Sequence, residues 1–75
     1  MDFAQWARER LWVDPAGKVP ARALYEDYLA WARRQEPVLG DVILSHVQFG
    51  RAAVSYGLRR SRGRGGRTYV GVSLR

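Results

Sequence analysis

The chain has 75 residues, a net charge of +6 and no cysteine, and 47% of its residues are hydrophobic. A chain this short folds as one unit, so we expect a single domain over residues 1–75 with little room for a buried catalytic cleft. The lack of cysteine excludes a disulfide scaffold and a cysteine-ligated zinc site and suits a reducing compartment. The start of the chain shows no apolar signal-peptide core, and no apolar run reaches the roughly 20 residues that cross a bilayer, so we expect a cytoplasmic protein without membrane contacts.

The basic side chains are distributed unevenly. Residues 1–37 carry six basic and six acidic side chains, whereas residues 38–75 carry seven arginines against Asp41 alone. Arginine forms forked hydrogen bonds to phosphate and guanine, so this half predicts a polyanionic partner, with nucleic acid ahead of an anionic membrane. The alternative is a solubilising surface, which would not require six arginines within seventeen residues.

The first half of the chain predicts two helices joined by a turn. Residues 2–11 place apolar side chains at helical spacing. Residues 14–17, Asp-Pro-Ala-Gly, fit a type I turn, and residues 18–19 would form a very short strand after it. A second helix is expected over residues 20–35, because Pro20 suits the first helical position and the Glu-Pro pair that follows the helix ends it.

A third helix is expected after a loop at residues 36–44. Ser45 and Gln48 have the spacing of a capping box, in which each side chain accepts a hydrogen bond from the backbone of the other residue. Gly57 is predicted to end the helix in the left-handed conformation. The predicted buried stripe of this helix is Phe49, Ala52, Ala53 and Tyr56.

Alternating residues then predict two strands at 58–62 and 67–74, with a Gly/Arg tip between them. In the second strand, one face would carry Val70, Val72 and Leu74, which we expect to pack on the helices. The predicted fold is therefore an α+β winged helix-turn-helix. It would have three helices, a C-terminal two-stranded wing and a third, very short strand before the second helix.

The outward face of the third helix is the first candidate site, because the second helix of a helix-turn-helix enters the major groove. Arg51 suits guanine, Gln48 suits adenine and Val47 suits a thymine methyl group. A solvated helix face is the alternative, and Gln48 is less free to contact a base if it closes the capping box. The DNA-contacting residues predicted on this helix are His46, Val47, Gln48, Arg51 and Ser55.

The wing is the second candidate site. Glycines at its tip would let the backbone approach a DNA groove, where arginines contact phosphates or enter the minor groove. A charged edge that prevents strand aggregation is the alternative, although one or two charges would suffice for that. The glycines do not follow a strand and open a helix, so a nucleotide-binding loop is rejected. The DNA-contacting residues predicted on the wing are Arg59, Arg60, Arg62, Arg64 and Arg67.

Catalysis has little support in this sequence. One histidine, His46, and no cysteine provide neither a nucleophilic dyad nor a metal cage, and the adjacent Glu26 and Asp27 are expected on a solvated helix face. We therefore expect no enzyme activity, no cofactor and no metal. The aromatic side chains are expected mainly in the core, although stacking on single-stranded bases is the alternative for an exposed residue such as Tyr69.

Several short motifs resemble the C-terminal winged-helix domain of phage and plasmid primase–helicases with a superfamily 3 motor, and poxvirus primase–helicases carry a related tail. The motifs are Val19-Pro20, Leu24-Tyr25-Glu26-Asp27-Tyr28 with Trp31, Ser45 to Arg51, Tyr56-Gly57-Leu58, and Arg67 to Leu74. The resemblance covers roughly residues 3–74. It implies a replication accessory module that grips DNA beside a motor, with residues 45–57 as the recognition helix and residues 59–67 as the wing. The chain has no Walker loop and no primase active site, so ATPase or priming activity would belong to residues outside it.

These observations predict a module that binds double-stranded DNA, with the rest of a primase–helicase polypeptide as a further partner. Three alternatives stay open: a winged helix that binds an acidic protein, a binder of single strands or RNA, and a stand-alone transcriptional regulator. The regulator would need a dimer surface, which the sequence does not identify. The sequence also leaves the DNA site and the oligomeric state undetermined.

Overall fold

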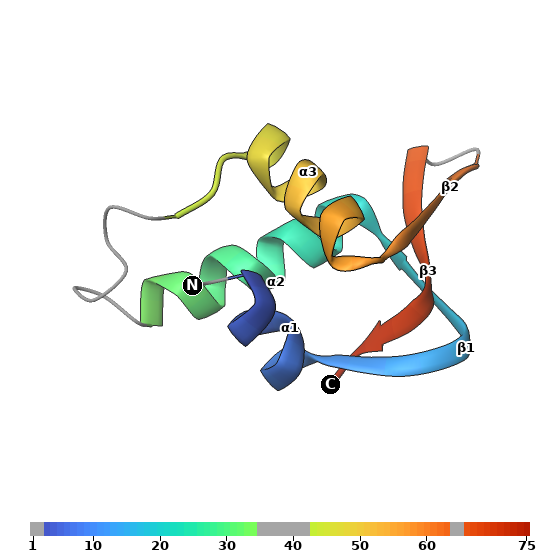
Figure 1. Ribbon diagram of the computed structural model, residues 1–75, viewed down its shortest axis with the longest axis horizontal. Coiled ribbons are helices and arrows are strands. Elements are labelled where there is room, and N and C mark those ends of the chain that lie inside the picture. The colour runs from blue at the N-terminus through green and yellow to red at the C-terminus, as the bar shows by residue number, and fades with distance from the viewer. Residues whose placement is uncertain (1–2, 35–42, 64–65) are drawn as a thin grey trace.

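The computed structural model describes residues 3–34, 43–63 and 66–75, and within them the chain forms three helices and a three-stranded antiparallel sheet. The domain is therefore of the α+β class. Figure 1 shows the helices gathered on one side and the strands on the other. None of the helices in the described ranges is long and apolar enough to span a bilayer. In chain order the elements are α1 (Phe3–Arg10), β1 (Leu11–Pro20), α2 (Ala21–Arg34), α3 (His46–Tyr56), β2 (Arg59–Gly63) and β3 (Gly66–Leu74).

The sheet has the order β1-β3-β2, so the last strand lies in the middle. The expected very short strand before α2 is instead the ten-residue β1, which pairs with β3 from Leu11 opposite Leu74 to Pro20 opposite Thr68. The sequence prediction was wrong here because the long partner strand lies more than forty residues away in the chain. Pro20 correspondingly ends β1, an edge strand where a missing N–H is tolerated, and α2 begins one residue later.

The predicted turn at residues 14–17 is an irregularity inside β1, where the pairing register shifts. The side chain of Asp14 accepts a hydrogen bond from the backbone N–H of Ala16, at 3.1 Å, as turn-forming Asp residues do. Gly17 is buried, and a Cβ atom there would lie 2.2 Å from the backbone oxygen of Val72. Only glycine therefore lets β1 pass this close to β3.

The predicted alternation in β3 was wrong in part. Tyr69 and Val72 are the buried residues of this strand, at 2% and 7% exposure, and both Val70 and Leu74 are only partly buried. The backbone of Gly71 has a φ of +82°, which interrupts the regular alternation between Tyr69 and Val72. Tyr56, predicted in the core, is 46% exposed, because the last turn of α3 reaches the edge of the core.

The core lies between the three helices and the inner face of the sheet. Apart from Val19, Val72 and a few alanines, the core consists of one leucine and large aromatic side chains. The aromatic rings contact one another, for example Trp6 and Phe49, whose ring centroids are 5.5 Å apart. Such rings supply the large buried area that a short chain needs. The buried hydrophobic residues are Phe3, Trp6, Ala7, Val19, Leu24, Tyr28, Trp31, Ala32, Phe49, Ala53, Tyr69 and Val72.

Two acidic side chains hold α1 and α2 together. Asp27, expected on a solvated face, accepts a hydrogen bond from the fully buried indole of Trp6 at 2.9 Å and pairs with Arg10 at 3.0 Å. Burial opposes ionisation of this carboxyl, but the hydrogen bonds from Arg10 and Trp6 and the charge of Arg10 outweigh it and lower its pKa. Glu9 likewise accepts a hydrogen bond from the indole of Trp31 at 3.0 Å. The carboxylates of Glu9 and Asp27 therefore stabilise the packing of α1 against α2.

Candidate nucleic-acid interface

Two tyrosines of α2 fix the start of α3. The hydroxyl of Tyr25 donates to the backbone oxygen of Leu44 at 2.9 Å, and the backbone N–H of Leu44 donates to the hydroxyl of Tyr28 at 3.0 Å. Burial raises the pKa of Tyr28, so its hydroxyl stays protonated. These bonds hold the residue before Ser45, so α2 determines where α3 begins and which face it exposes.

The predicted caps of α3 are confirmed. The Ser45 hydroxyl accepts from the backbone N–H of Gln48 at 3.2 Å, and the Gln48 amide oxygen accepts from the backbone N–H of Ser45 at 3.0 Å. Gly57 follows the helix with a φ of +113°. Because its amide oxygen is engaged in the cap, Gln48 lacks the free acceptor that a paired contact to adenine needs.

The register of the β2–β3 hairpin divides its arginines between two faces. Residues directly opposite in an antiparallel pair share a face, and neighbours along a strand alternate. Arg60 lies opposite Tyr69, and Arg62 lies opposite Arg67, so these four side chains share one face. Tyr69 is buried, which identifies this face as the one toward the helices. Arg59 precedes Arg60 and therefore lies on the other face.

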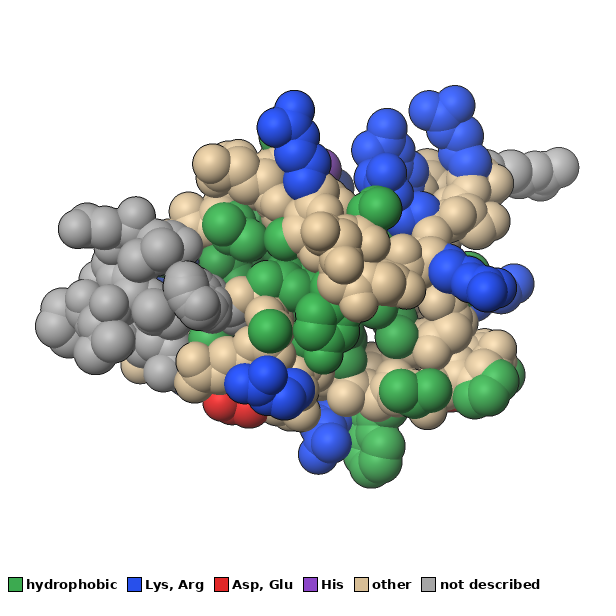
Figure 2. All heavy atoms as spheres, in the orientation of Figure 1, with side chains coloured by type: hydrophobic (Ala, Val, Ile, Leu, Met, Phe, Trp, Pro, Cys, Tyr) green, Lys and Arg blue, Asp and Glu red, His purple; other side chains and the backbone are tan. Residues whose placement is uncertain are grey.

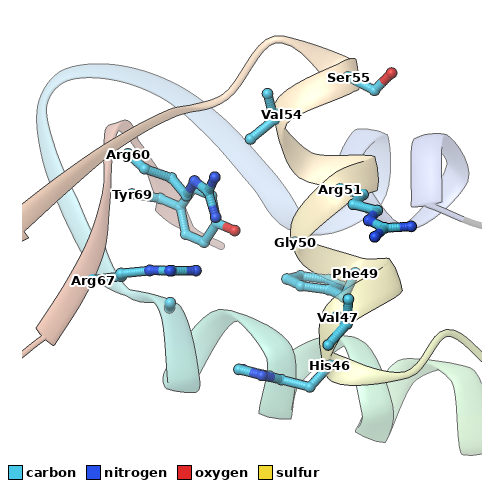
Figure 3. Close-up of a pocket in the computed structure, with 11 residues that line it drawn as sticks. His46, Val47, Phe49, Gly50, Arg51, Val54, Ser55, Arg60, Arg67 and Tyr69 are labelled. Carbon is cyan, nitrogen blue, oxygen red and sulfur yellow. The ribbon is translucent and has the colours of Figure 1, made fainter.

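A groove of about 510 Å³ separates the hairpin from α3. Figure 3 shows Arg60 and Arg67 extending from the hairpin toward the helix, with Val54 extending from the helix toward them. Phe49 and Tyr69, both buried, form the floor. The residues of α3 that line the groove, besides Phe49, are His46, Val47, Gly50, Arg51, Val54 and Ser55.

Arg60 reaches across the groove to the helix. A Cβ atom placed on Gly50 would lie 3.8 Å from Nη1 of Arg60, so the guanidinium lies over the part of α3 that has no side chain. Gly50 has no left-handed backbone that would require glycine, since the glycines with positive φ in the described chain are Gly57, Gly66 and Gly71. A smaller hollow of about 220 Å³ continues along the hairpin over Arg60, Ser61, Arg62 and Arg67.

The groove carries an unbalanced positive charge. No Asp or Glu follows Asp41 in the sequence, and the ion pairs formed within the described ranges, Arg10–Asp27 and Arg22–Glu26, both lie in the first half of the chain. Figure 2 shows Lys and Arg side chains along the side of the molecule that carries α3 and the hairpin, and also at the opposite edge, where the acidic side chains visible in this view lie beside them. Two arginines directly opposite on one strand pair repel each other, and a polyanion would relieve that repulsion.

The structure brings most of the predicted site residues together. Six of the ten line the groove between α3 and the hairpin: His46, Val47, Arg51, Ser55, Arg60 and Arg67. Arg62 lines the adjoining hollow. Gln48 and Arg59 are exposed but line neither, and Arg64 lies outside the described residues.

Sequence reasoning missed Gly50 and Val54. Both lie on the stripe of Val47, at i+3 and i+7, so the helical period that identified the exposed face was a signal for them as well. The approach of Arg60 to Gly50 had no sequence signal, because it depends on how the hairpin packs beside α3.

The alternative of base stacking on Tyr69 loses its structural basis. The Tyr69 ring is 2% exposed, so a base cannot lie on its face without disrupting the core. The exposed aromatic side chains in the described part of the chain include Trp12, at 54%, and Tyr56. The ring of Trp12 is covered on one side by the guanidinium of Arg75, whose central carbon lies 4.6 Å from the ring centroid.

No protein-family model matches this chain, and comparison with curated protein sequences finds no significant match.

Proposed function

We propose that this domain is a winged helix-turn-helix that binds duplex DNA. The observation that carries the proposal is the groove between α3 and the hairpin. The exposed stripe of the helix and three hairpin arginines, Arg60, Arg62 and Arg67, face the same side, and no acidic residue occurs in that half of the chain after Asp41. A polyanion is the partner that this charge arrangement attracts.

In the proposed complex, α3 enters the major groove and the hairpin lies along the adjacent phosphates or minor groove. Arg51 extends from the exposed face of α3 with the forked donors that guanine accepts. The three helices and the three-stranded antiparallel sheet are compatible with a winged helix, although β1 forms a full strand before α2 and α3 where the sequence predicted a very short one. The two tyrosines of α2 that hold Leu44 would fix the angle at which α3 meets the DNA.

We further propose, from the resemblance to phage and plasmid primase–helicases, that the domain is an accessory module for replication. In that role it would hold duplex DNA near a helicase motor, and ATP hydrolysis or primer synthesis would be carried out by other parts of the polypeptide. The domain itself would contribute binding and no chemistry.

The test is a titration with random-sequence duplex DNA at several salt concentrations. If about four to six phosphates are neutralised, the logarithm of the affinity should fall with the logarithm of the salt concentration at a slope of about −4 to −5. Amide NMR shifts should concentrate at residues 46–51 and 59–67. Shifts confined to α1 would contradict the assigned face, and no salt-sensitive binding to DNA would favour an acidic protein partner.

Two neighbouring arginines provide a matched control. Arg60→Gln removes a charge from the groove, whereas Arg59→Gln removes the same charge from the other face of the same strand. We expect the first variant to bind duplex about eightfold more weakly at 0.1 M salt, because one phosphate contact contributes about 0.9 to the salt slope. The second should bind within about twofold of the unmodified protein, because its charge lies off the groove. Equal reductions would mean that overall charge, and not the groove, determines binding.

A further inference from the structure

The wall that α3 presents to the groove is apolar at both ends. Val47 is 64% exposed and Val54 is 48% exposed, and both line the groove. They are seven residues apart, which places them on one face of the helix two turns apart. Gly50 lies between them and leaves that stretch of the wall open to the guanidinium of Arg60. Two exposed valines thus flank a cation on the surface that we propose meets DNA.

Exposed apolar side chains inside a basic groove are suited to contact an apolar group on a polyanionic ligand. A DNA duplex offers such groups in the major groove as the methyl on C5 of a pyrimidine, found in thymine and in 5-methylcytosine. We infer that Val47 and Val54 contact C5-methyl groups of two pyrimidines in the major groove. This inference rests on the proposed duplex binding, and the basic walls formed by Arg51, Arg60 and Arg67 are what select DNA as the occupant.

The helix geometry sets the spacing of the two contacts. Seven residues at a rise of about 1.5 Å separate the valines by about 10.5 Å along the axis of α3. Base pairs stack at about 3.4 Å, so for a helix lying along the groove the two methyl groups are about three base pairs apart. Arg51 lies between the valines in sequence, so a guanine contact belongs between the two methylated pyrimidines.

The experiment compares one randomised duplex pool made in three ways: with thymine, with uracil in place of thymine, and with uracil together with 5-methylcytosine in place of cytosine. These pools have the same phosphates and hydrogen-bonding groups and differ in the C5-methyl groups alone. We expect the uracil pool to bind about fourfold more weakly for each methyl group that a valine contacts, or about 15-fold more weakly for two. Restored binding with 5-methylcytosine would show that the methyl group itself is recognised.

Three protein variants locate the contact. Val47→Ala and Val54→Ala should each reduce the thymine-to-uracil ratio, and the double variant should bind both pools equally, because neither valine side chain then remains to contact a methyl group. Val13→Ala is the matched control, because Val13 is 92% exposed and lies on β1, outside the groove. Its thymine-to-uracil ratio should equal that of the unmodified protein. Circular dichroism of each variant checks that the fold is kept.

The outcomes separate this inference from the proposed function. Salt-sensitive binding that is equal for the thymine and uracil pools would overturn methyl recognition and leave duplex binding standing. A thymine preference that persists in the double valine variant would also overturn it, because another residue would then be responsible. Failure to bind any of the pools would overturn both. Loss of the preference in the valine variants alone supports the inference.

Discussion

Arg62 and Arg67 face each other across the β2–β3 hairpin, and this pairing predicts a conflict between stability and binding. Like charges directly opposite on a strand pair destabilise it, and the sequence offers no acid after Asp41 to compensate. Replacing Arg62 with Gln keeps a long polar side chain and removes the repulsion. We therefore expect Arg62→Gln to melt about 2–4 °C higher than the unmodified protein at low salt.

The same substitution should weaken duplex binding. Removing one phosphate contact lowers the salt slope by about 0.9. At 0.1 M salt this corresponds to an affinity about eightfold lower, and the loss of affinity becomes smaller as the salt concentration rises. The gain in melting temperature should fade as well, because ions screen exposed charges. Thermal unfolding and DNA titration on the same samples measure both effects.

Arg59→Gln is the control for this experiment, since Arg59 lies on the opposite face of the same strand, across from Val70. The changes that Arg59→Gln causes in melting temperature and in DNA affinity should both be much smaller than those caused by Arg62→Gln. The reasoning is refuted if Arg62→Gln lowers the melting temperature at low salt, because the facing arginines would then not repel. It is also refuted if binding is unchanged, because this face of the hairpin would then not contact DNA.

Three further predictions concern stability. Asp27→Ala should destabilise the fold by about 2 kcal/mol in urea unfolding at neutral pH, because it leaves a buried indole N–H without its acceptor. Since the pKa of Asp27 is lowered in the folded state, its ionic contribution is present above the ordinary carboxyl pKa and is lost as pH falls through the lowered value, so the difference in stability between the two proteins should narrow in acid. Gly17→Ala should prevent normal folding, seen as a collapse of NMR dispersion, because its Cβ would lie 2.2 Å from the backbone oxygen of Val72. Gly50→Ala should instead stabilise the fold by about 0.5–1 kcal/mol in the same urea assay, since its Cβ has room and alanine favours the helix; a decrease in stability would contradict this.

The groove could be predicted only in part. The helical period identified the exposed face of α3, and the run of arginines identified the hairpin. Which arginines face the helix depends on the pairing of β2 with β3, and this pairing separates Arg59 from Arg60 although they are neighbours in the sequence. The position of Arg60 over the open stretch at Gly50 follows from packing between elements, so no local pattern signals it.

The sequence by itself determined what short-range chemistry controls. Ser45 and Gln48 specify the start of α3 and Gly57 its end, because caps involve residues within one turn of each other. The charge asymmetry is likewise a property of composition. Tertiary structure decided the rest. Residues 11–20 form a full strand because β3 pairs along their length. Asp27, which the sequence predicted on a solvated face, instead accepts a hydrogen bond from the indole of Trp6. Such outcomes depend on which distant groups meet in a small core, where an unpaired buried donor is costly, and the local sequence does not specify that meeting.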